Sequence, residues 1–382
     1  MFWIALTLVC AALLGHLVHH QLSLPRVIGY SAMGMSLAAL GTGLPDGALL
    51  GTERLIVDLA LAVLLFELGA HVPLDWLRAN RMLLLTSLLE SSVGYVAVFA
   101  VLALCGFPAE VSLSGAAVLG VSAGALAGRI AAELRSSGQV TDRMLVLSAL
   151  NTLYSVLLLK LLGGSLLIGQ GHWVRGISEP VYTFAGAVVV AALLARAVSA
   201  LLRRADLREE NPVLLMLGLL LLSLTVARMF ELSTLLVPLL AGVLLRNGSE
   251  RPCVWPRHFG TAGGVLVLLL FVVAGASWSW SAWAGGGLVA AMLLLVRFGA
   301  KALVLAGLAR VSDISLKQGM ALALTLSPVC ATVLVLMAEL HRSLPSVAVQ
   351  LAPVALAALA MMSLLGPILI HVGLRWAKEE LQ

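Results

Sequence analysis

Long apolar stretches follow one another along almost the whole sequence and constrain the fold more than any other feature. A helix needs about 20 apolar residues to span a bilayer, and Gly, Pro and charged residues divide this chain into thirteen such stretches. Of the 382 residues 61% are hydrophobic and 11% charged, with a mean hydropathy of +1.05. These values lie outside the range of soluble domains. The sequence therefore predicts an all-α polytopic membrane protein with no separate soluble domain.

The expected helices lie near residues 2–19, 24–41, 54–71, 81–105, 111–134, 143–168, 180–202, 212–228, 231–246, 260–278, 283–309, 315–339 and 346–374.

The positions of the basic residues test this count. Of the 24 Lys and Arg residues, 17 fall in segments on one side of the membrane, four on the other and three inside helices. Basic loops face the cytoplasm, so the N-terminus is expected outside and the C-terminus inside, in the inner membrane of a bacterial cell. The net charge of +5 is thus explained by loops and does not indicate nucleic-acid binding. The cysteines form no metal-binding spacing, and neither a metal, a cofactor nor enzymatic activity is expected.

Two expected helices that are seven apart in the chain contain matching weak points. The fifth has Gly120-Val121-Ser122-Ala123-Gly124 in its middle, and the twelfth has Leu326-Ser327-Pro328-Val329. Proline removes a backbone donor, and inverted repeats of transporters contain discontinuous helices that meet at the bilayer midplane. The sequence predicts an inverted repeat with two crossing, discontinuous helices. Close packing through small residues is the alternative explanation.

Ionisable residues inside helices mark a candidate site, because charges in the bilayer centre face a bundle interior or a cavity. Arg297 and Lys301 are one turn apart in the eleventh expected helix, and Glu90 lies in the fourth. Glu90 is either a structural partner of this basic pair or a proton carrier. Lys160, in the sixth helix, either belongs to the same basic core or extends to the interface.

Several motifs resemble those of the monovalent cation/proton antiporters, in the branch that includes glutathione-gated potassium efflux systems. Leu24-Pro25-Arg26-Val27-Ile28-Gly29-Tyr30 resembles the opening of that branch's second helix, and Leu64-Leu65-Phe66-Glu67-Leu68-Gly69 resembles a segment of its third. Leu240-Ala241-Gly242-Val243-Leu244-Leu245 is similar to its ninth helix, and Arg297 with Lys301 to its basic pair.

The resemblance implies a sodium/proton antiporter-like fold in one transmembrane domain, residues 1–376, with a short cytoplasmic tail at 377–382. Scaffold or dimer helices would cover about 2–71 and 212–278, core helices about 81–168 and 283–374, and a linking helix about 180–202. The family places its ion site at the two breaks and on the sixth helix. The matching candidates here are Ser122, Asn151, Thr152 and Ser327.

The chain departs from the family where the chemistry takes place. The sixth helix of the family carries an aspartate that binds cation and proton in turn, and this chain has Asn151-Thr152 at that place. Threonine cannot titrate, which leaves Glu90 as the candidate replacement. The resemblance implies exchange of sodium or potassium for protons by alternating access, in a possible homodimer within the lipid bilayer. Two alternatives stay open: transport of a small anion or organic acid by the basic core, and a membrane scaffold without transport.

Overall fold

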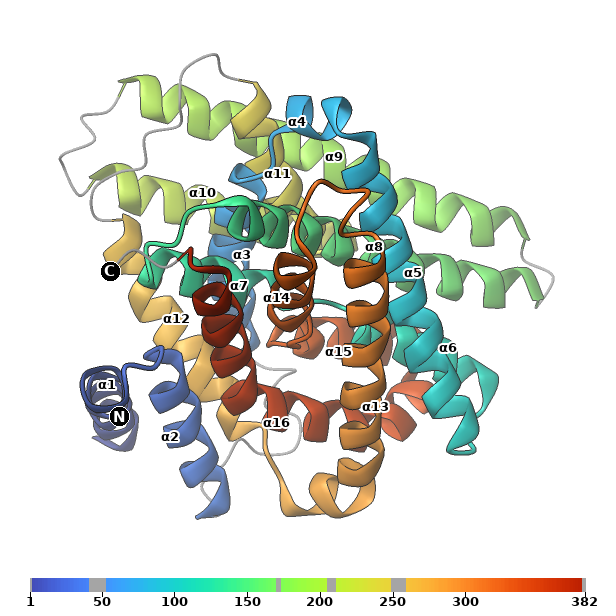
Figure 1. Cartoon of the computed structure of the whole chain (residues 1–382). Helices are drawn as coiled ribbons and strands as arrows, with labels where there is room; N and C mark the ends of the chain where they lie inside the picture. Colours follow the sequence, from blue (N-terminus) through green and yellow to red (C-terminus); the bar gives the residue numbers. More distant parts are fainter. Residues whose placement is uncertain (1, 41–52, 170–172, 205–210, 249–258, 380–382) are drawn as a thin grey trace.

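A computed structural model describes residues 2–40, 53–169, 173–204, 211–248 and 259–379, and these residues form helices and connecting turns without strands. Figure 1 shows the helices as one bundle, with α7, α14 and α15 near its middle. The helices are α1 (Phe2–Leu22), α2 (Val27–Ala39), α3 (Glu53–Ala70), α4 (Leu74–Ala79), α5 (Arg81–Leu104), α6 (Ala109–Leu119), α7 (Gly124–Glu133), α8 (Gln139–Gly169), α9 (Trp173–Arg204), α10 (Asn211–Met229), α11 (Leu236–Asn247), α12 (Phe259–Ala276), α13 (Trp280–Gly307), α14 (Leu316–Leu326), α15 (Thr332–Ser343) and α16 (Pro345–Ala377).

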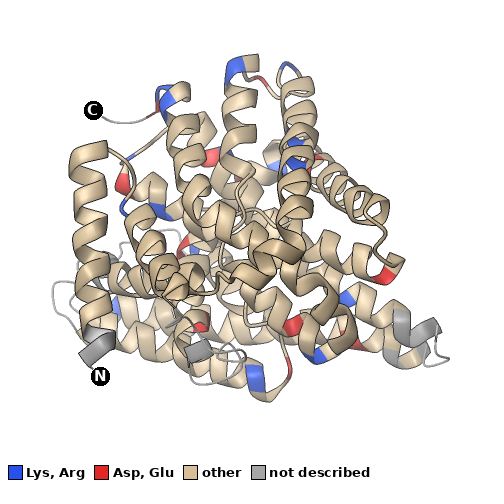
Figure 2. Ribbon diagram, turned by 90° about the horizontal axis from the view of Figure 1, so that it is seen from below, with Lys and Arg blue, Asp and Glu red and all other residues tan. Residues whose placement is uncertain are grey.

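Each of the thirteen predicted stretches contains one or two of the described helices, which confirms the polytopic all-α fold. The fifth stretch comprises α6 and α7, and the twelfth comprises α14 and α15. Seven stretches, among them α6 with α7, are long and apolar enough to cross a membrane. Charged positions lie mostly toward the edges of the bundle in Figure 2, and its centre is largely uncharged. Charged residues are costly within a bilayer, so their scarcity in the spanning segments agrees with a membrane protein.

The structure contains one helix that was not predicted, and two helices begin five residues or more from their predicted starts. The short helix α4 was not predicted, because six residues are too few to give a periodic apolar pattern. Helix α11 begins only at Leu236, since Glu231 takes a left-handed φ of 54° in the preceding turn. Helix α9 begins at Trp173 and continues through Pro180, which is the predicted start of this helix. The carbonyl of Gly176, four residues before this proline, packs against Gly164 of α8.

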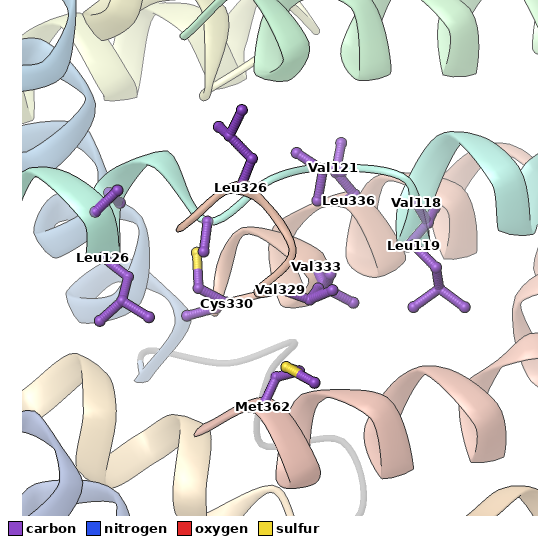
Figure 3. Close-up of a cluster of buried hydrophobic side chains, with 14 of the residues drawn as sticks. Val118, Leu119, Val121, Leu126, Leu326, Val329, Cys330, Val333, Leu336 and Met362 are labelled. Atoms are coloured by element: carbon purple, nitrogen blue, oxygen red, sulfur yellow. The ribbon is translucent and has the colours of Figure 1, made fainter. Parts of the chain in front are cut away.

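Both predicted helix breaks are present. Helix α6 ends at Leu119 and α7 begins at Gly124, and α14 ends at Leu326 and α15 begins at Thr332. The two irregular segments cross each other, where the backbone N–H of Ala123 donates to the carbonyl of Pro328 over 2.9 Å. Figure 3 shows this crossing among buried apolar side chains from both breaks and from α16.

Glycines bring α3 and α11 into very close contact. A Cβ atom built on Gly69 would lie 2.1 Å from the backbone oxygen of Leu239. One built on Gly242 would lie 2.1 Å from the backbone oxygen of Phe66. No side chain fits at either position, and the small-residue contact lets the two backbones approach as in other membrane helix pairs.

Helices α2 and α12 make the same kind of contact through Gly34 and Gly275, where an added Cβ would lie 2.1 Å and 2.2 Å from backbone oxygens. These are the second and tenth stretches, and α11 and α3 are the ninth and third. An offset of seven stretches therefore converts one contact into the other, in agreement with the inverted repeat.

Replacement of Gly242 by leucine should destabilise the protein strongly, because the new side chain meets backbone and not a movable side chain. Overpacking of this kind costs about 3 kcal/mol, and we expect a clear fall in the thermal unfolding midpoint in detergent. Gly218 is the matched control, since nothing lies within 4 Å of a Cβ built on it. Equal midpoints for Gly242→Leu and Gly218→Leu would contradict the close helix contact.

Candidate ion-binding site

Arg297 joins the two helix breaks. It is completely buried on α13 and donates hydrogen bonds to the carbonyls of Gly120 at 3.1 Å and Val121 at 2.7 Å, and to the carbonyl of Ser327. These carbonyls lie at the C-terminal ends of α6 and α14. The last carbonyls of a helix lack partners within the helix and carry the negative end of its dipole. One guanidinium group therefore satisfies and neutralises both half-helix ends.

One turn further along α13, Lys301 completes a closed ring of hydrogen bonds, which we call the crossing ring. Its Nζ donates to a carboxylate oxygen of Glu90 and to Oγ of Ser122 at 2.8 Å. Ser91 donates to the other oxygen of Glu90 at 3.2 Å and accepts from Nδ2 of Asn151 at 3.0 Å. Oδ1 of Asn151 accepts from the backbone N–H of Ser122 at 2.6 Å. The ring thus links α5, α8, α13 and the break after α6.

All five residues of the crossing ring are at most 2% exposed. Breaking a buried ion pair by removal of one partner costs about 3–5 kcal/mol, so Glu90 and Lys301 depend on each other. The predicted site residues Glu90, Lys301, Ser122 and Asn151 meet in this ring. Arg297 lies beside it.

Three predicted site residues lie outside the crossing ring. Thr152 is buried, but its hydroxyl donates to the carbonyl of Ser148 in its own helix at 2.9 Å. The hydroxyl of Ser327 likewise donates to Ala323 at 2.5 Å, although the Ser327 carbonyl binds Arg297. Lys160 pairs with Glu339 of α15 at 2.8 Å and makes no contact with the ring.

Sequence reasoning missed Ser91, Tyr95 and Glu339. The Tyr95 hydroxyl donates to the carbonyl of Asn151 at 3.2 Å and lies 2.9 Å from Oγ of Ser155. The signal for Ser91 and Tyr95 was their spacing of four residues from each other, with Ser87 four residues before Ser91, which places polar groups on one face of α5. No pattern in the sequence pointed to the pairing of Glu339 with Lys160.

A cavity of about 290 Å³ lies between α3, α7 and α8. Its lining includes the charged or titratable residues Glu67, His71, Arg129 and Asp142. Leu68 also lines it, and this side chain lies against Gly124 at the start of α7. The cavity therefore reaches from polar helix ends toward the crossing.

The segment after α16 folds back onto the beginning of α8. Lys378 takes a left-handed φ of 60°, and the Glu379 carboxylate accepts from the backbone N–H groups of Val140 at 2.8 Å and Thr141 at 2.7 Å. The first N–H groups of a helix need such partners, and negative charge is stabilising there. The residues from 377 onward were expected to form only a tail, but Ala377 ends α16 and Glu379 caps α8.

The chain is similar to solved transporter structures over its full length. The sodium proton antiporter MjNhaP1 from Methanocaldococcus jannaschii at pH 8 matches with a TM-score of 0.76 and 16% identity, over 100% of this chain and 98% of that one. An electron-microscopy structure of the same antiporter matches with a TM-score of 0.72 and 16% identity, over 99% and 96%. No curated protein matches the chain. At this identity the similarity establishes the fold.

Two broken helices that cross in a polytopic bundle define the class of secondary transporters with an antiporter fold. The sequence profile of the family "sodium/hydrogen exchanger, transmembrane" matches residues 5–376. The chain therefore belongs to the sodium/hydrogen exchanger family, whose members are transporters and not enzymes.

Proposed function

We propose that this protein exchanges a monovalent cation, sodium or potassium, for protons, and that the crossing ring is where cation and proton compete. The observation that carries the proposal is the buried pair of Glu90 and Lys301 beside the break after α6. Among the described residues that touch the crossing ring, Glu90 supplies the single carboxylate. The carboxylate of Glu90 pairs with one cationic group, the ammonium of Lys301. A metal cation at this carboxylate would take the place of that ammonium, so the two compete for one position.

The competition requires one proton for each cation. With no metal cation bound, the protonated amine of Lys301 pairs with the carboxylate of Glu90. When Lys301 releases its proton, a metal cation takes its place at the carboxylate, with hydroxyl oxygens of Ser91 and Ser122 nearby. Hydroxyl and carboxylate oxygens are suitable ligands for small hard cations. Binding of a proton to Lys301 then expels the cation.

Alternating access follows from the division into two groups of helices. Helices α5 to α8 and α13 to α16 form the moving core, α1 to α3 and α10 to α12 form the scaffold, and α9 links them. The cavity beside Glu67 lies between scaffold helix α3 and core helices α7 and α8, and it serves as the inner access path. The N-terminus lies outside and the C-terminus in the cytoplasm of a bacterial cell, and a homodimer is the expected assembly.

The charge arrangement counts against anion transport. Carbonyl groups at the half-helix ends neutralise Arg297, Glu90 neutralises Lys301, and Glu339 neutralises Lys160. Each of the three basic residues predicted for the core thus has a partner in the described structure, and none of them is left to attract an anion.

Proton flux in proteoliposomes tests the proposal. A preset pH gradient is monitored with an entrapped dye while sodium, potassium or a series of anions is added outside. We expect dissipation by sodium or potassium that is independent of the anion. Dissipation that follows the anion would support the alternative substrate, and none under any condition would indicate a scaffold without transport.

Exchange should be electrically neutral. The crossing ring has the same net charge with a protonated Lys301 as with a neutral Lys301 and one bound cation, so neither direction of movement transfers net charge. One uncompensated charge would couple to voltage by about 2.3 kcal/mol per 100 mV. Sodium-driven proton flux should therefore change less than about twofold when the potential is clamped at plus or minus 100 mV. A steep voltage dependence would require a second proton site.

A further inference from the structure

A groove of about 520 Å³ lies between α9 and the end of α11, remote from the crossing ring. Its charged lining residues are Arg196 and Arg203, both exposed and both on α9. They are seven residues apart, so their Cα atoms lie two turns or about 10.5 Å apart along one face. Among the described residues that line this groove there is no carboxylate.

Small residues make room between the two arginines. Ala192, Ala195 and Ser199 of α9 line the groove, and Gly248 closes it after α11. Larger side chains at these places would fill the space beside the guanidinium groups. The groove can therefore admit a compact anionic group. Guanidinium groups bind phosphate oxygens with two parallel hydrogen bonds.

The same face of α9 is apolar further from its end. Val189 is 59% exposed and Leu193 60% exposed, and with Arg196 they follow helical spacing along one stripe. In a membrane protein such a stripe contacts the hydrocarbon of the bilayer. A lipid lying along this stripe would have its headgroup beside the arginines and its acyl chains beside the apolar part.

We propose that this groove binds an anionic phospholipid, with its phosphate between Arg196 and Arg203 and an acyl chain along Leu193 and Val189. Basic pockets between transmembrane helices bind acidic headgroups in this way. The positive groove fits the phosphate, and the continuous apolar stripe favours a lipid over a free anion. Helix α9 connects the two helix groups, so the lipid would bind the linking helix and not the ion site.

Native mass spectrometry of the detergent-solubilised protein tests the proposal. The protein is titrated with phosphatidylglycerol and, separately, with phosphatidylcholine of the same acyl chains. We expect preferential binding of phosphatidylglycerol. Each arginine near the surface should raise the affinity for an acidic lipid about fivefold. The double variant Arg196→Gln/Arg203→Gln should therefore bind phosphatidylglycerol about 30-fold more weakly. Phosphatidylcholine binding should change little.

The matched control is Arg78→Gln/Arg310→Gln, which removes the same charge from two exposed arginines outside the groove. This variant should bind phosphatidylglycerol as the unchanged protein does. Equal loss in both variants, or no loss in the groove variant, would overturn the proposal. A third titration uses inorganic phosphate alone. If phosphate bound with an affinity equal to that of the lipid, the groove would be a site for a free anion instead.

Discussion

Replacement of Glu90 by glutamine should abolish cation-dependent proton exchange while the protein still reaches the membrane. Glutamine keeps the size of the side chain, but it cannot neutralise Lys301 or attract a metal cation. The remaining buried ammonium group should also lower the free energy of unfolding by about 3–5 kcal/mol. Dye-monitored flux in proteoliposomes and thermal unfolding in detergent measure the two effects separately.

Glu339→Gln is the matched control for this experiment. Glu339 is also a buried glutamate paired with a lysine, but its partner Lys160 is outside the crossing ring. We expect a comparable loss of stability with exchange retained. Unchanged sodium- or potassium-dependent flux in Glu90→Gln would disprove the role of Glu90 and leave the exchange without an assigned cation site. Loss of exchange in both variants would show that stability alone explains the effect.

Replacement of Arg297 by methionine should lower the stability strongly. Methionine has a similar length but no donor, so the carbonyls of Gly120, Val121 and Ser327 would lose the partner described above. Each unsatisfied buried group costs about 1–3 kcal/mol, and we expect a total loss of at least about 3 kcal/mol. Thermal unfolding should report a much lower midpoint, and exchange should be lost with it.

Arg143→Met provides the comparison. Arg143 is only partly buried and donates to one carbonyl, that of Ser312, at 2.7 Å. Its replacement should cost about 1 kcal/mol. If Arg297→Met unfolded at the same temperature as Arg143→Met, the hydrogen bonds by which Arg297 joins the two breaks would add no more stability than the single hydrogen bond of Arg143.

The order of the apolar helices along the chain could be predicted because it depends on local properties. Apolar length identifies a span, and glycine or proline weakens a helix whatever surrounds it. Both kinds of signal are present in the residues themselves, so the thirteen stretches and the breaks near Ser122 and Pro328 are confirmed. The turn at Glu231 was missed because its left-handed backbone leaves no compositional mark.

The candidate site could be predicted only in part, because its contacts join distant parts of the chain. Burial costs identified Glu90, Arg297 and Lys301 as interior groups, and the structure brings them together. Lys160 is also a basic residue within an apolar helix. Its partner Glu339 lies more than 170 residues further along the chain, and residue spacing cannot reveal such a pair. The ion-binding roles of Asn151, Thr152 and Ser327 stay predictions.

The fold-back of Glu379 onto α8 has a practical consequence for the design of expression vectors. A tag or reporter joined directly after this residue would be attached beside the contact that orders the beginning of α8, the helix that carries Asn151. Attachment there can alter transport without touching the ion site. A spacer that leaves Glu379 free to cap α8, or a tag at the opposite end of the chain, avoids this source of error in flux measurements.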